Sequence, residues 1–476
     1  MNLKDLTIKK AHKGLIKKEF SSTELTKAYL EQIKKVDKDV KAFITVTEKE
    51  ALNQAEKVDQ KIAQGDSISE LAGIPYAAKD LFCTQGIKTT AGSKILENFI
   101  SPYESTTTQR LSEQDAVLIG KTNLDEFAMG SSTENSSFFV TKNPHDKTRV
   151  PGGTSGGSAA SVSADEVIYA VATDTGGSIR QPASFCGVVG LKVTYGRTSR
   201  YGVVAYASSL DTIGHLTKNV EDSAIVLQAI AGKDEHDSTT SNIALDNYEK
   251  ELKKDIKGVK IGIPKGYLEM QGLNPKVKFL IEKGIKRIEE LTGEKAREIE
   301  LMPPDYALAC YYIIMPSEVS SNLARYDGIK YGLSEKTENL LKSYLKTRAK
   351  GFGDEVKRRI ILGTFTLSHG YYDAYYKKAQ AVRASVIQSF KKAFDQIDVI
   401  IMPTAPGTAF KIGEKTNDLL QMYLEDLYTI PASLAGLPAL SVPCGKVNNL
   451  PVGLQIIGNW FDEKSILRLA HHFEVS

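Results

Sequence analysis

The sequence has few of the features that mark metal-binding, disulfide-linked or membrane-spanning proteins. Its 476 residues include four cysteines, which are widely separated and form no CxxC pair: Cys83, Cys186, Cys310 and Cys444. This spacing argues against a zinc site or a redox motif and favours buried free thiols in a reducing compartment. No run approaches the ~18 apolar residues of a membrane span, and the charged N-terminus has no apolar signal segment. We therefore expect a cytoplasmic protein.

The sequence also lacks a large excess of either positive or negative charge. The chain has 61 basic and 58 acidic residues, a formal net charge of +3. Such a balance argues against a broad nucleic-acid-binding surface, although it leaves room for a local patch or for a partner protein. No internal repeat or low-complexity linker divides the chain, which favours one large domain over 1–476. Within it we expect a helical N-terminal segment (1–65) and a peripheral excursion or internal seam at the polar stretch 232–258.

What the sequence does contain is an alternation of short apolar runs and helical patterns. The apolar runs end in Gly, Pro or polar residues and predict strands that are buried on both faces: 116–123, 167–173, 259–266, 398–404, 437–445 and 450–458. Helical patterns lie between them, at 220–231, 275–292, 373–396 and 463–473. Near the N-terminus, Ser21 with Glu24 and Thr47 with Glu50 fit capping boxes. The alternation predicts an α/β protein with a central mixed sheet covered by helices on both faces.

Two segments rich in Gly and Ser stand out, PGGTSGGSAA (151–160) and DTGGSIRQP (174–182). The second follows a predicted strand directly, so it can present the Ser178 hydroxyl beside the backbone N–H groups of Thr175, Gly176 and Gly177. Such N–H groups can stabilise an oxyanion, and glycine permits the close approach. A phosphate-binding loop fits poorly, because no GK[ST] ending is present and no strand leads into 152–157.

A nucleophilic serine needs a base. Of the seven histidines, only His215 and His369 lie in internal segments, and we interpret both as structural residues. Lys79 is more suggestive, because it follows a strand-like run of small and apolar residues. Burial there would lower its pKa and make a neutral amine available. An ion pair between Lys79 and Asp80 or another acidic residue is an equal alternative on local sequence.

These residues together resemble the amidase signature family, which uses a Ser–cis-Ser–Lys triad on a large α/β fold. Within that family, further segments look like the glutaminase components of the amidotransferases that act on Glu-tRNA(Gln) or Asp-tRNA(Asn). They are DEFAMGSSTE (125–134), SSNLARYDGIKYG (320–332), EVKRRIILGTF (355–365), GYYDAYYKKAQ (370–380) and TIPASLAGLPALSVP (429–443). The resemblance covers nearly the whole chain.

The resemblance implies a role for each member of the triad. Ser178 matches the nucleophile and Lys79 the base. Thr154 occupies the position of the family's bridging serine, which follows a cis peptide bond. Threonine keeps the hydroxyl needed for a proton relay, although its β-branching restricts the rotamer. Ser155 is a possible substitute donor that would point elsewhere if the loop geometry is kept.

The resemblance also implies a site for glutamine. Arg359 matches the residue that holds the α-carboxylate, with Arg358 as the alternate. Asp426 matches the partner of the α-ammonium group, and Tyr311, with Tyr312 as its alternate, lines the amide end. A zwitterion in a desolvated pocket needs one fixed cation and one fixed anion, and arginine is a natural carboxylate clamp. Asp174 and Arg180 flank the nucleophile and are expected to brace its loop.

The implied function is that of a glutaminase within a larger complex. The chain would release ammonia from glutamine for a B subunit, which uses ATP and Mg²⁺ to amidate a misacylated tRNA, while a C subunit joins the two. We expect no metal or cofactor in this chain itself. Two rival interpretations are a free-standing amidase of small carboxamides, which needs no zwitterion clamp, and a non-catalytic scaffold, for which Thr154 is the only support.

Overall fold

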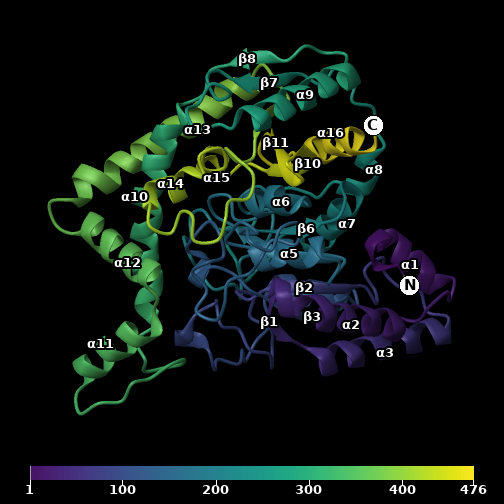
Figure 1. Ribbon diagram of the computed structural model, residues 1–476, viewed down its shortest axis with the longest axis horizontal. Coiled ribbons are helices and arrows are strands. Elements are labelled where there is room, and N and C mark those ends of the chain that lie inside the picture. Colours follow the sequence, from purple (N-terminus) through teal and green to yellow (C-terminus); the bar gives the residue numbers. More distant parts are fainter. Residues whose placement is uncertain (1) are drawn as a thin grey trace.

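A single mixed sheet of 11 strands runs through the molecule in the computed structural model, which describes residues 2–476 (Figure 1). Its strand order is β1-β3-β2-β4-β6-β5-β10-β11-β9-β7-β8. The strands are β1 (Phe43–Val46), β2 (Pro75–Lys79), β3 (Val117–Thr122), β4 (Tyr169–Asp174), β5 (Val189–Lys192), β6 (Thr212–Thr217), β7 (Ile261–Pro264), β8 (Arg297–Ile299), β9 (Val399–Pro403), β10 (Ala439–Val447) and β11 (Leu450–Gly458).

Helices flank this sheet. They are α1 (Ile8–Ile16), α2 (Ser22–Val40), α3 (Glu48–Gln64), α4 (Thr106–Glu113), α5 (Gly156–Ser163), α6 (Arg180–Cys186), α7 (Val220–Ile230), α8 (Tyr248–Leu252), α9 (Pro275–Thr292), α10 (Pro304–Asn322), α11 (Leu340–Gly351), α12 (Asp354–Leu367), α13 (Lys378–Phe394), α14 (Leu419–Leu424), α15 (Ile430–Ala435) and α16 (Glu463–Val475). Short 3-10 segments are η1 (Leu3–Asp5), η2 (Lys94–Leu96), η3 (Glu126–Ala128) and η4 (Leu323–Arg325), and η5 (Tyr372–Lys377) is a π-helical turn. The predicted α/β fold is confirmed.

The sheet mixes parallel and antiparallel pairs. Strand β2 lies parallel to β3 and β4, and β7 lies parallel to β8 and β9. The strands between β4 and β9 pair in antiparallel fashion, including the β10–β11 hairpin. All six predicted strands are present, as β3, β4, β7, β9, β10 and β11. Most are buried along their length because helices and loops cover both faces.

The N-terminal segment is helical except for the short strand β1, which the sequence did not indicate. The capping box of Ser21 and Glu24 is present at the start of α2. The one predicted for Thr47 and Glu50 is wrong, since Thr47 makes no capping bond. Its hydroxyl instead donates to the Leu118 carbonyl, 2.8 Å away on β3. The reason is that Thr47 directly follows β1 and is held by the pairing of that strand with β3.

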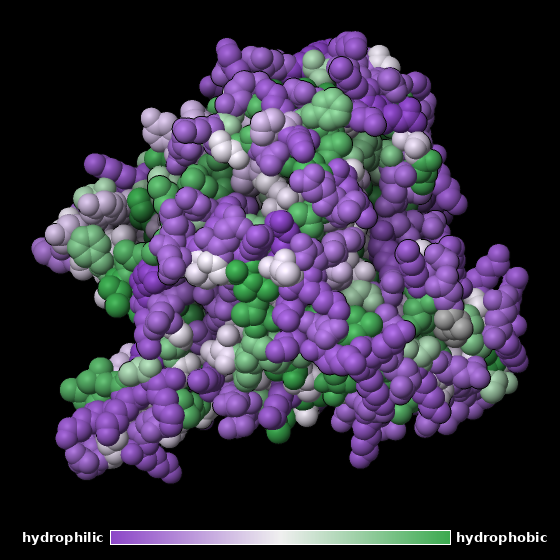
Figure 2. Space-filling model, in the orientation of Figure 1, coloured by the Kyte–Doolittle hydropathy of each residue, from purple (hydrophilic) through white to green (hydrophobic). Residues whose placement is uncertain are grey.

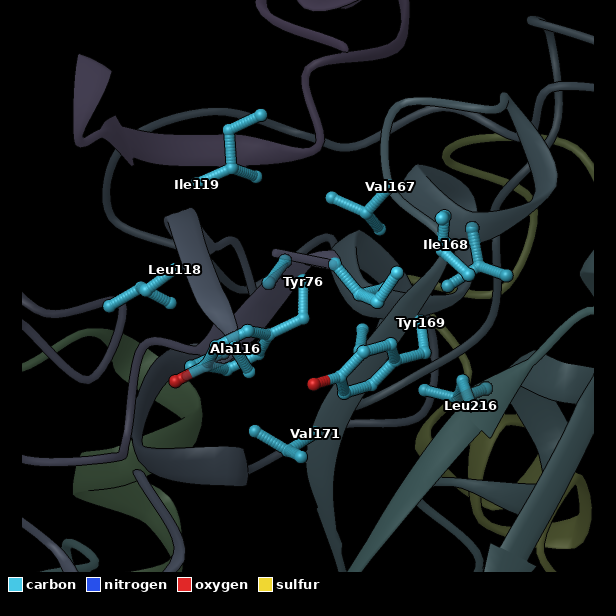
Figure 3. Close-up of a cluster of buried hydrophobic side chains, with 14 of the residues drawn as sticks. Tyr76, Ala116, Leu118, Ile119, Val167, Ile168, Tyr169, Val171 and Leu216 are labelled. Atoms are coloured by element: carbon cyan, nitrogen blue, oxygen red, sulfur yellow. The ribbon is translucent and has the colours of Figure 1, made fainter. Parts of the chain in front are cut away.

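The predicted helices are confirmed as α7, α9, α16 and, for 373–396, η5 followed by α13. The polar stretch 232–258 contains α8 and places Tyr248, Leu252 and Ile256 in the core. Figure 3 shows the part of the core that supports β2 and β4, where the rings of Tyr76 and Tyr169 stack with centroids 5.3 Å apart. Within residues 2–476, no helix combines the length and apolarity needed to cross a membrane.

Candidate active site

Lys79 ends strand β2 and is completely buried. Its Nζ donates to Thr154 Oγ1 at 2.7 Å and to Thr173 Oγ1 at 2.9 Å. Burial lowers the pKa of Lys79 to about 7, although the carboxylates of Asp125, Asp174 and Asp211 act in the opposite direction. A large share of this amine is therefore neutral near pH 7, as a general base requires.

The alternative that pairs Lys79 with Asp80 is wrong. Asp80 instead lies 3.1 Å from Lys121 Nζ, and both side chains are fully buried. The register of β2 and β3 explains why Asp80 pairs with Lys121 and not with Lys79. Ala78 lies beside Lys121 and Lys79 lies beside Thr122, so the alternation of side chains puts Asp80 and Lys121 on one face and Lys79 on the other.

The segment 151–160 forms a tight wall beside Lys79. The Gly153–Thr154 peptide is cis, as the resemblance implied, and Thr154 is completely buried. A Cβ atom on Gly153 would lie 2.4 Å from Asp125 Oδ2, so only glycine fits there. The Ser155 hydroxyl donates to the Thr173 carbonyl at 3.2 Å and thus faces away from Lys79. Thr154 is the residue of this segment whose hydroxyl meets the lysine.

Ser178 lies in the turn between β4 and α6, with 8% of its surface exposed. Asp174 and Arg180 brace this turn through two short contacts, Nη2–Oδ1 at 2.9 Å and Nε–Oδ2 at 3.0 Å. Burial works to raise the pKa of Asp174, but Arg180 holds it below its ordinary value. The Ser155 N–H donates to the Ser178 carbonyl at 3.1 Å. This bond joins the turn to the segment that carries Thr154.

The expected oxyanion donors differ from the structure at one position. The Gly177 N–H donates to Asp174 Oδ1 at 2.9 Å and is therefore occupied. The N–H groups of Thr175 and Gly176, which were expected as donors, and of Ser178, which was not, have no hydrogen-bond partner among residues 2–476. The same Asp174 carboxylate that binds Arg180 also binds this backbone, which explains the difference.

Two residues that the sequence did not single out hold these loops in place. Thr429 Oγ1 donates to the Gly176 carbonyl at 2.6 Å. Gln181 accepts from the Gly153 N–H at 2.9 Å and donates to the Ser131 carbonyl at 2.9 Å. Both residues lie inside the segments that carried the resemblance, but a sequence pattern does not show which neighbours of a nucleophile its loops contact.

Tyr311 is the tyrosine that reaches the nucleophile turn. A Cβ atom on Gly176 would lie 2.7 Å from the Tyr311 hydroxyl, so glycine is needed where the tyrosine passes. The alternate, Tyr312, turns away and stacks on Tyr423 with ring centroids 4.0 Å apart. Tyr206 links the two parts of the site, because it accepts a hydrogen bond from Arg359 and its hydroxyl lies close to that of Tyr311.

Arg359, on α12, is the buried member of the arginine pair, with 3% exposure. Its Nε donates to Glu355 Oε1 at 2.7 Å, and its guanidinium lies 5.8 Å from the ring centroids of Tyr312 and Tyr423. The alternate, Arg358, is partly exposed and pairs with Glu355 at the rim. The burial of Arg359 among aromatic rings suits it to bind a carboxylate away from water.

Asp426 is buried close to these groups, just after α14. Its Oδ2 accepts a hydrogen bond from Ser131 Oγ at 2.6 Å. Burial raises the pKa of Asp426 to about 8, with a further rise from Glu425, against the lowering effects of Ser131 and Arg359. An ammonium group beside this carboxyl would favour its ionised form.

Two cavities of about 220 Å³ each border the site. One is lined by Arg359, Tyr423 and the loop around Ser132, and the other by Thr173, Tyr206 and Asp211. The hydrogen bond between Arg359 and Tyr206 lies between the two. Among the described residues, no group of three or more His, Cys, Asp or Glu side chains is placed to hold a metal ion.

The fold is that of amide-hydrolysing enzymes, and the buried Lys79–Thr154 pair lies beside the turn that carries Ser178. The family model described as Amidase matches residues 24–467, so the chain belongs to the amidase family. Its membership in the amidase signature group, expected from the motifs, is confirmed.

Relatives refine the position of the chain within the family. It is 54% identical over 475 residues to the A subunit of the glutamyl-tRNA(Gln) amidotransferase of Desulfatibacillum aliphaticivorans, covering 100% of this chain and 98% of the relative. It is 58% identical over 471 residues to the corresponding protein of a Cyanothece species, covering 98% and 97%. The crystal structure of the Thermotoga maritima counterpart has a TM-score of 0.81 and 43% identity, over 99% of this chain and 94% of that one.

Proposed function

We propose that the chain is the glutaminase component of a tRNA-dependent amidotransferase. It hydrolyses glutamine to glutamate and ammonia, and the ammonia serves to amidate Glu-tRNA(Gln), Asp-tRNA(Asn) or both. The observation that carries the proposal is the 2.7 Å hydrogen bond from buried Lys79 Nζ to Thr154 Oγ1 beside Ser178. The identity of more than half of the residues with A subunits of this enzyme class supports it.

The reaction begins with a proton relay. Neutral Lys79 accepts a proton from Thr154 Oγ1 while Thr154 accepts one from Ser178 Oγ. Ser178 then attacks the side-chain amide carbon of glutamine, and the N–H groups of Gly176 and Ser178 stabilise the oxyanion. The relay returns a proton to the leaving nitrogen and ammonia departs. Water hydrolyses the glutamyl ester, which releases glutamate and restores Ser178.

The substrate specificity comes from the charged pair at the far end of the pocket. Arg359 binds the α-carboxylate and Asp426 the α-ammonium group, while Tyr311 positions the amide next to Gly176. These roles favour a free amino acid over a simple carboxamide, because both charges are desolvated in the pocket. A free-standing small-amide amidase would have no use for this pair.

The remaining parts of the reaction belong to partners. A B subunit binds ATP and Mg²⁺ and activates the misacylated tRNA, and a C subunit joins it to this chain in a cytoplasmic heterotrimer. This chain itself needs no metal or cofactor for the glutaminase step, since its lysine, threonine and serine supply base, relay and nucleophile.

Replacement of the nucleophile tests the proposal. Ser178→Ala in the complete complex should reduce glutamine-dependent amidation by about 10³-fold or more and leave ammonium-dependent amidation unchanged. Ser155→Ala is the matched control, because its hydroxyl faces the Thr173 carbonyl. If Ser178→Ala retained glutamine-dependent activity, the proposed nucleophile would be wrong. If activity on simple amides persisted in Arg359→Ala, the free-standing amidase would be favoured.

A further inference from the structure

Thr173 is the second residue whose hydroxyl contacts Lys79, and the proposed proton relay does not use it. It lies on β4, which is next to β2 in the sheet, and its Oγ1 is 2.9 Å from Lys79 Nζ. Thr154 Oγ1 is 2.7 Å from the same nitrogen. Among residues 2–476, these two hydroxyls are the only hydrogen-bond partners of Lys79 Nζ. The amine therefore meets one hydroxyl that the relay needs and one that has no role in it.

The protein, and not bulk solvent, sets the orientation of this amine. Figure 2 shows a surface made largely of hydrophilic side chains, which can exchange hydrogen bonds with water. Lys79 and Thr154 have no exposed surface, and Thr173 has 4%. A buried N–H group that loses its acceptor costs free energy, so the amine is held where its two hydroxyl partners lie.

The orientation of the amine matters for its action as a base. A neutral lysine amine has two N–H groups and one lone pair, and only the lone pair can take a proton. In the proposed mechanism the lone pair must face Thr154, whose hydroxyl is the donor. An N–H that donates to Thr173 Oγ1 takes up a second direction and prevents rotation about the last bond of the side chain. Without it, an N–H could face Thr154 in place of the lone pair.

The surroundings of Thr173 favour its role as an acceptor. Its side chain lines the cavity of about 220 Å³ that Tyr206 and Asp211 also line. A cavity of this volume with polar groups in its wall has room for water, so the Thr173 hydroxyl proton can point into it and away from Lys79. Thr154 lines neither of the two cavities that border the site. The two threonines thus differ in what their protons can reach.

Thr173 is also firmly fixed in the fold. Its strand pairs with β6 on the side away from β2, and Thr173 lies opposite Ile213. Its carbonyl accepts a hydrogen bond from the Ser155 hydroxyl at 3.2 Å, and Ser155 is next to Thr154. Branching at Cβ restricts its rotamer. Its side chain thus contacts the base, and its backbone holds the segment that carries the relay hydroxyl.

We propose that Thr173 is a positioning residue for the base: its hydroxyl accepts an N–H of Lys79 and so turns the lone pair of the amine toward Thr154. The inference rests on the proposed function, in which Lys79 is the base. It adds a fourth side chain to the relay of lysine, threonine and serine, one that passes no proton and acts only through Lys79.

Removal of this hydroxyl tests the inference. In the complete complex, Thr173→Val keeps the shape of the side chain and should lower kcat for glutamine by about tenfold or more, with KM changed by less than about threefold. Thr173→Ser keeps the acceptor and should stay within about threefold of the wild type in both constants. Thr404→Val is the matched control, because Thr404 is also fully buried and loses one hydroxyl contact, at 3.0 Å to Ser441. It should leave kcat within about threefold.

A pH profile separates the positioning of the base from a purely structural role. An acceptor stabilises the ammonium form of Lys79 more than the neutral amine. Its loss should therefore lower the pKa of Lys79 and move the acid limb of kcat/KM to lower pH by about 0.5–1 unit. The carboxylates of Asp125, Asp174 and Asp211, which also raise this pKa, are unchanged in all three variants. A purely structural role would lower kcat and leave the acid limb in place.

Labelling of Ser178 with a fluorophosphonate gives the same comparison without glutamine. Ser178 Oγ bonds to phosphorus and displaces fluoride, while the hydroxyl proton passes along the relay to Lys79, so the labelling rate reports on the relay. Thr173→Val should slow the labelling of the full chain by about tenfold and shift its pH dependence in the same direction. Thr173→Ser and Thr404→Val should be labelled at nearly the wild-type rate.

The inference is overturned if Thr173→Val keeps kcat and the labelling rate within about threefold of the wild type. It is also overturned if the acid limb of this variant does not move, or if Thr173→Ser loses as much activity as Thr173→Val. If the wild-type complex is labelled at Ser178 but does not hydrolyse glutamine, the glutaminase proposal fails, and the labelling rates still decide the role of Thr173. If the complex hydrolyses glutamine and Thr173→Val does so equally well, the inference is wrong and the glutaminase stands.

Discussion

Lys79 and Lys192, at opposite sides of the turn that carries Ser178, have almost the same pKa but different surroundings. Burial lowers the pKa of Lys79 to about 7, and burial together with Arg180 lowers that of Lys192 to about 7. Lys79 donates to the hydroxyls of Thr154 and Thr173. Lys192 donates to the backbone carbonyls of Val193 and Leu437.

The difference shows that a perturbed pKa does not by itself make a catalytic base. A hydroxyl can pass its proton to a neutral amine and recover one from a neighbour, whereas a carbonyl oxygen has no proton to give. Lys192 has the acidity of a base with no proton relay beside it. What supports Lys79 as the base in the proposed mechanism is its contact with Thr154, next to Ser178.

The largest effect should come from exchanging the lysines one at a time for methionine. Lys79→Met removes the base and should lower the kcat of the complex for glutamine by about 10²–10⁴-fold. Lys192→Met should change kcat by less than about threefold, because no proton passes through it. Steady-state glutaminase assays would show the contrast. Equal losses in the two variants would mean that buried positive charge, rather than the relay, is what the site requires.

The next largest effect should come from replacing Thr154, the residue that relays the proton. Thr154→Val keeps the shape of the side chain and removes the hydroxyl, so kcat should fall by about 10²-fold or more. Thr154→Ser keeps the hydroxyl and should retain activity within about tenfold of the wild type. If the wild-type complex used ammonium but not glutamine, and Thr154→Ser restored glutamine use, the chain would be a scaffold that has lost its activity.

The third effect is on pH dependence. Lys79 must be neutral to act, so kcat/KM should fall about tenfold per unit as the pH drops below about 7. Lys121→Met leaves Asp80 as an unpaired buried carboxylate one residue from Lys79. The loss of the Lys121 charge leaves the Asp80 charge uncompensated, which favours the protonated form of Lys79, so the acid limb should move to higher pH.

A double variant checks the cause of that shift. Lys121→Met/Asp80→Asn removes the charge together with its partner and should return the limb to its original position. The pH–rate profile of the complex gives both results. Lys121 also donates to the Phe82 carbonyl at 2.8 Å. If the acid limb stayed shifted in the double variant, the shift would therefore come from distortion of this loop and not from the charge of Asp80.

Much of this architecture could be predicted from sequence because the strands are short runs that are apolar on both faces. Strand β1 was missed because it has only four residues and lies at an edge of the sheet. The motifs located Lys79, Thr154 and Ser178, which follow strands or tight turns. They could not show whether Lys79 pairs with Asp80, since the partner of Asp80 depends on which strand lies beside β2 and in what register.

Helical register limited the prediction of the substrate residues in a similar way. Arg358 and Arg359 differ by about 100° around α12, and only the packing on α10 shows which one is buried. The contacts of Thr429 and Gln181 join segments far apart in the chain. The occupied Gly177 N–H depends on the orientation of one carboxylate, Asp174, which a pattern of residue types does not contain.

The smallest effect should appear in stability and would sharpen the comparison of the two lysines. With a pKa of about 7 when folded and an ordinary value of 10.5, Lys192 binds more protons in the unfolded chain than in the folded one between these values. Its burial therefore costs most stability below pH 7, and this cost disappears as the pH rises toward 10.5. Lys192→Met has no such cost. Its melting temperature, relative to the wild type, should fall by about 1–2 °C per pH unit from pH 7 to 10. A constant difference across this range would show that Lys192 stays protonated in the folded protein, so that the two lysines would differ in pKa as well as in surroundings.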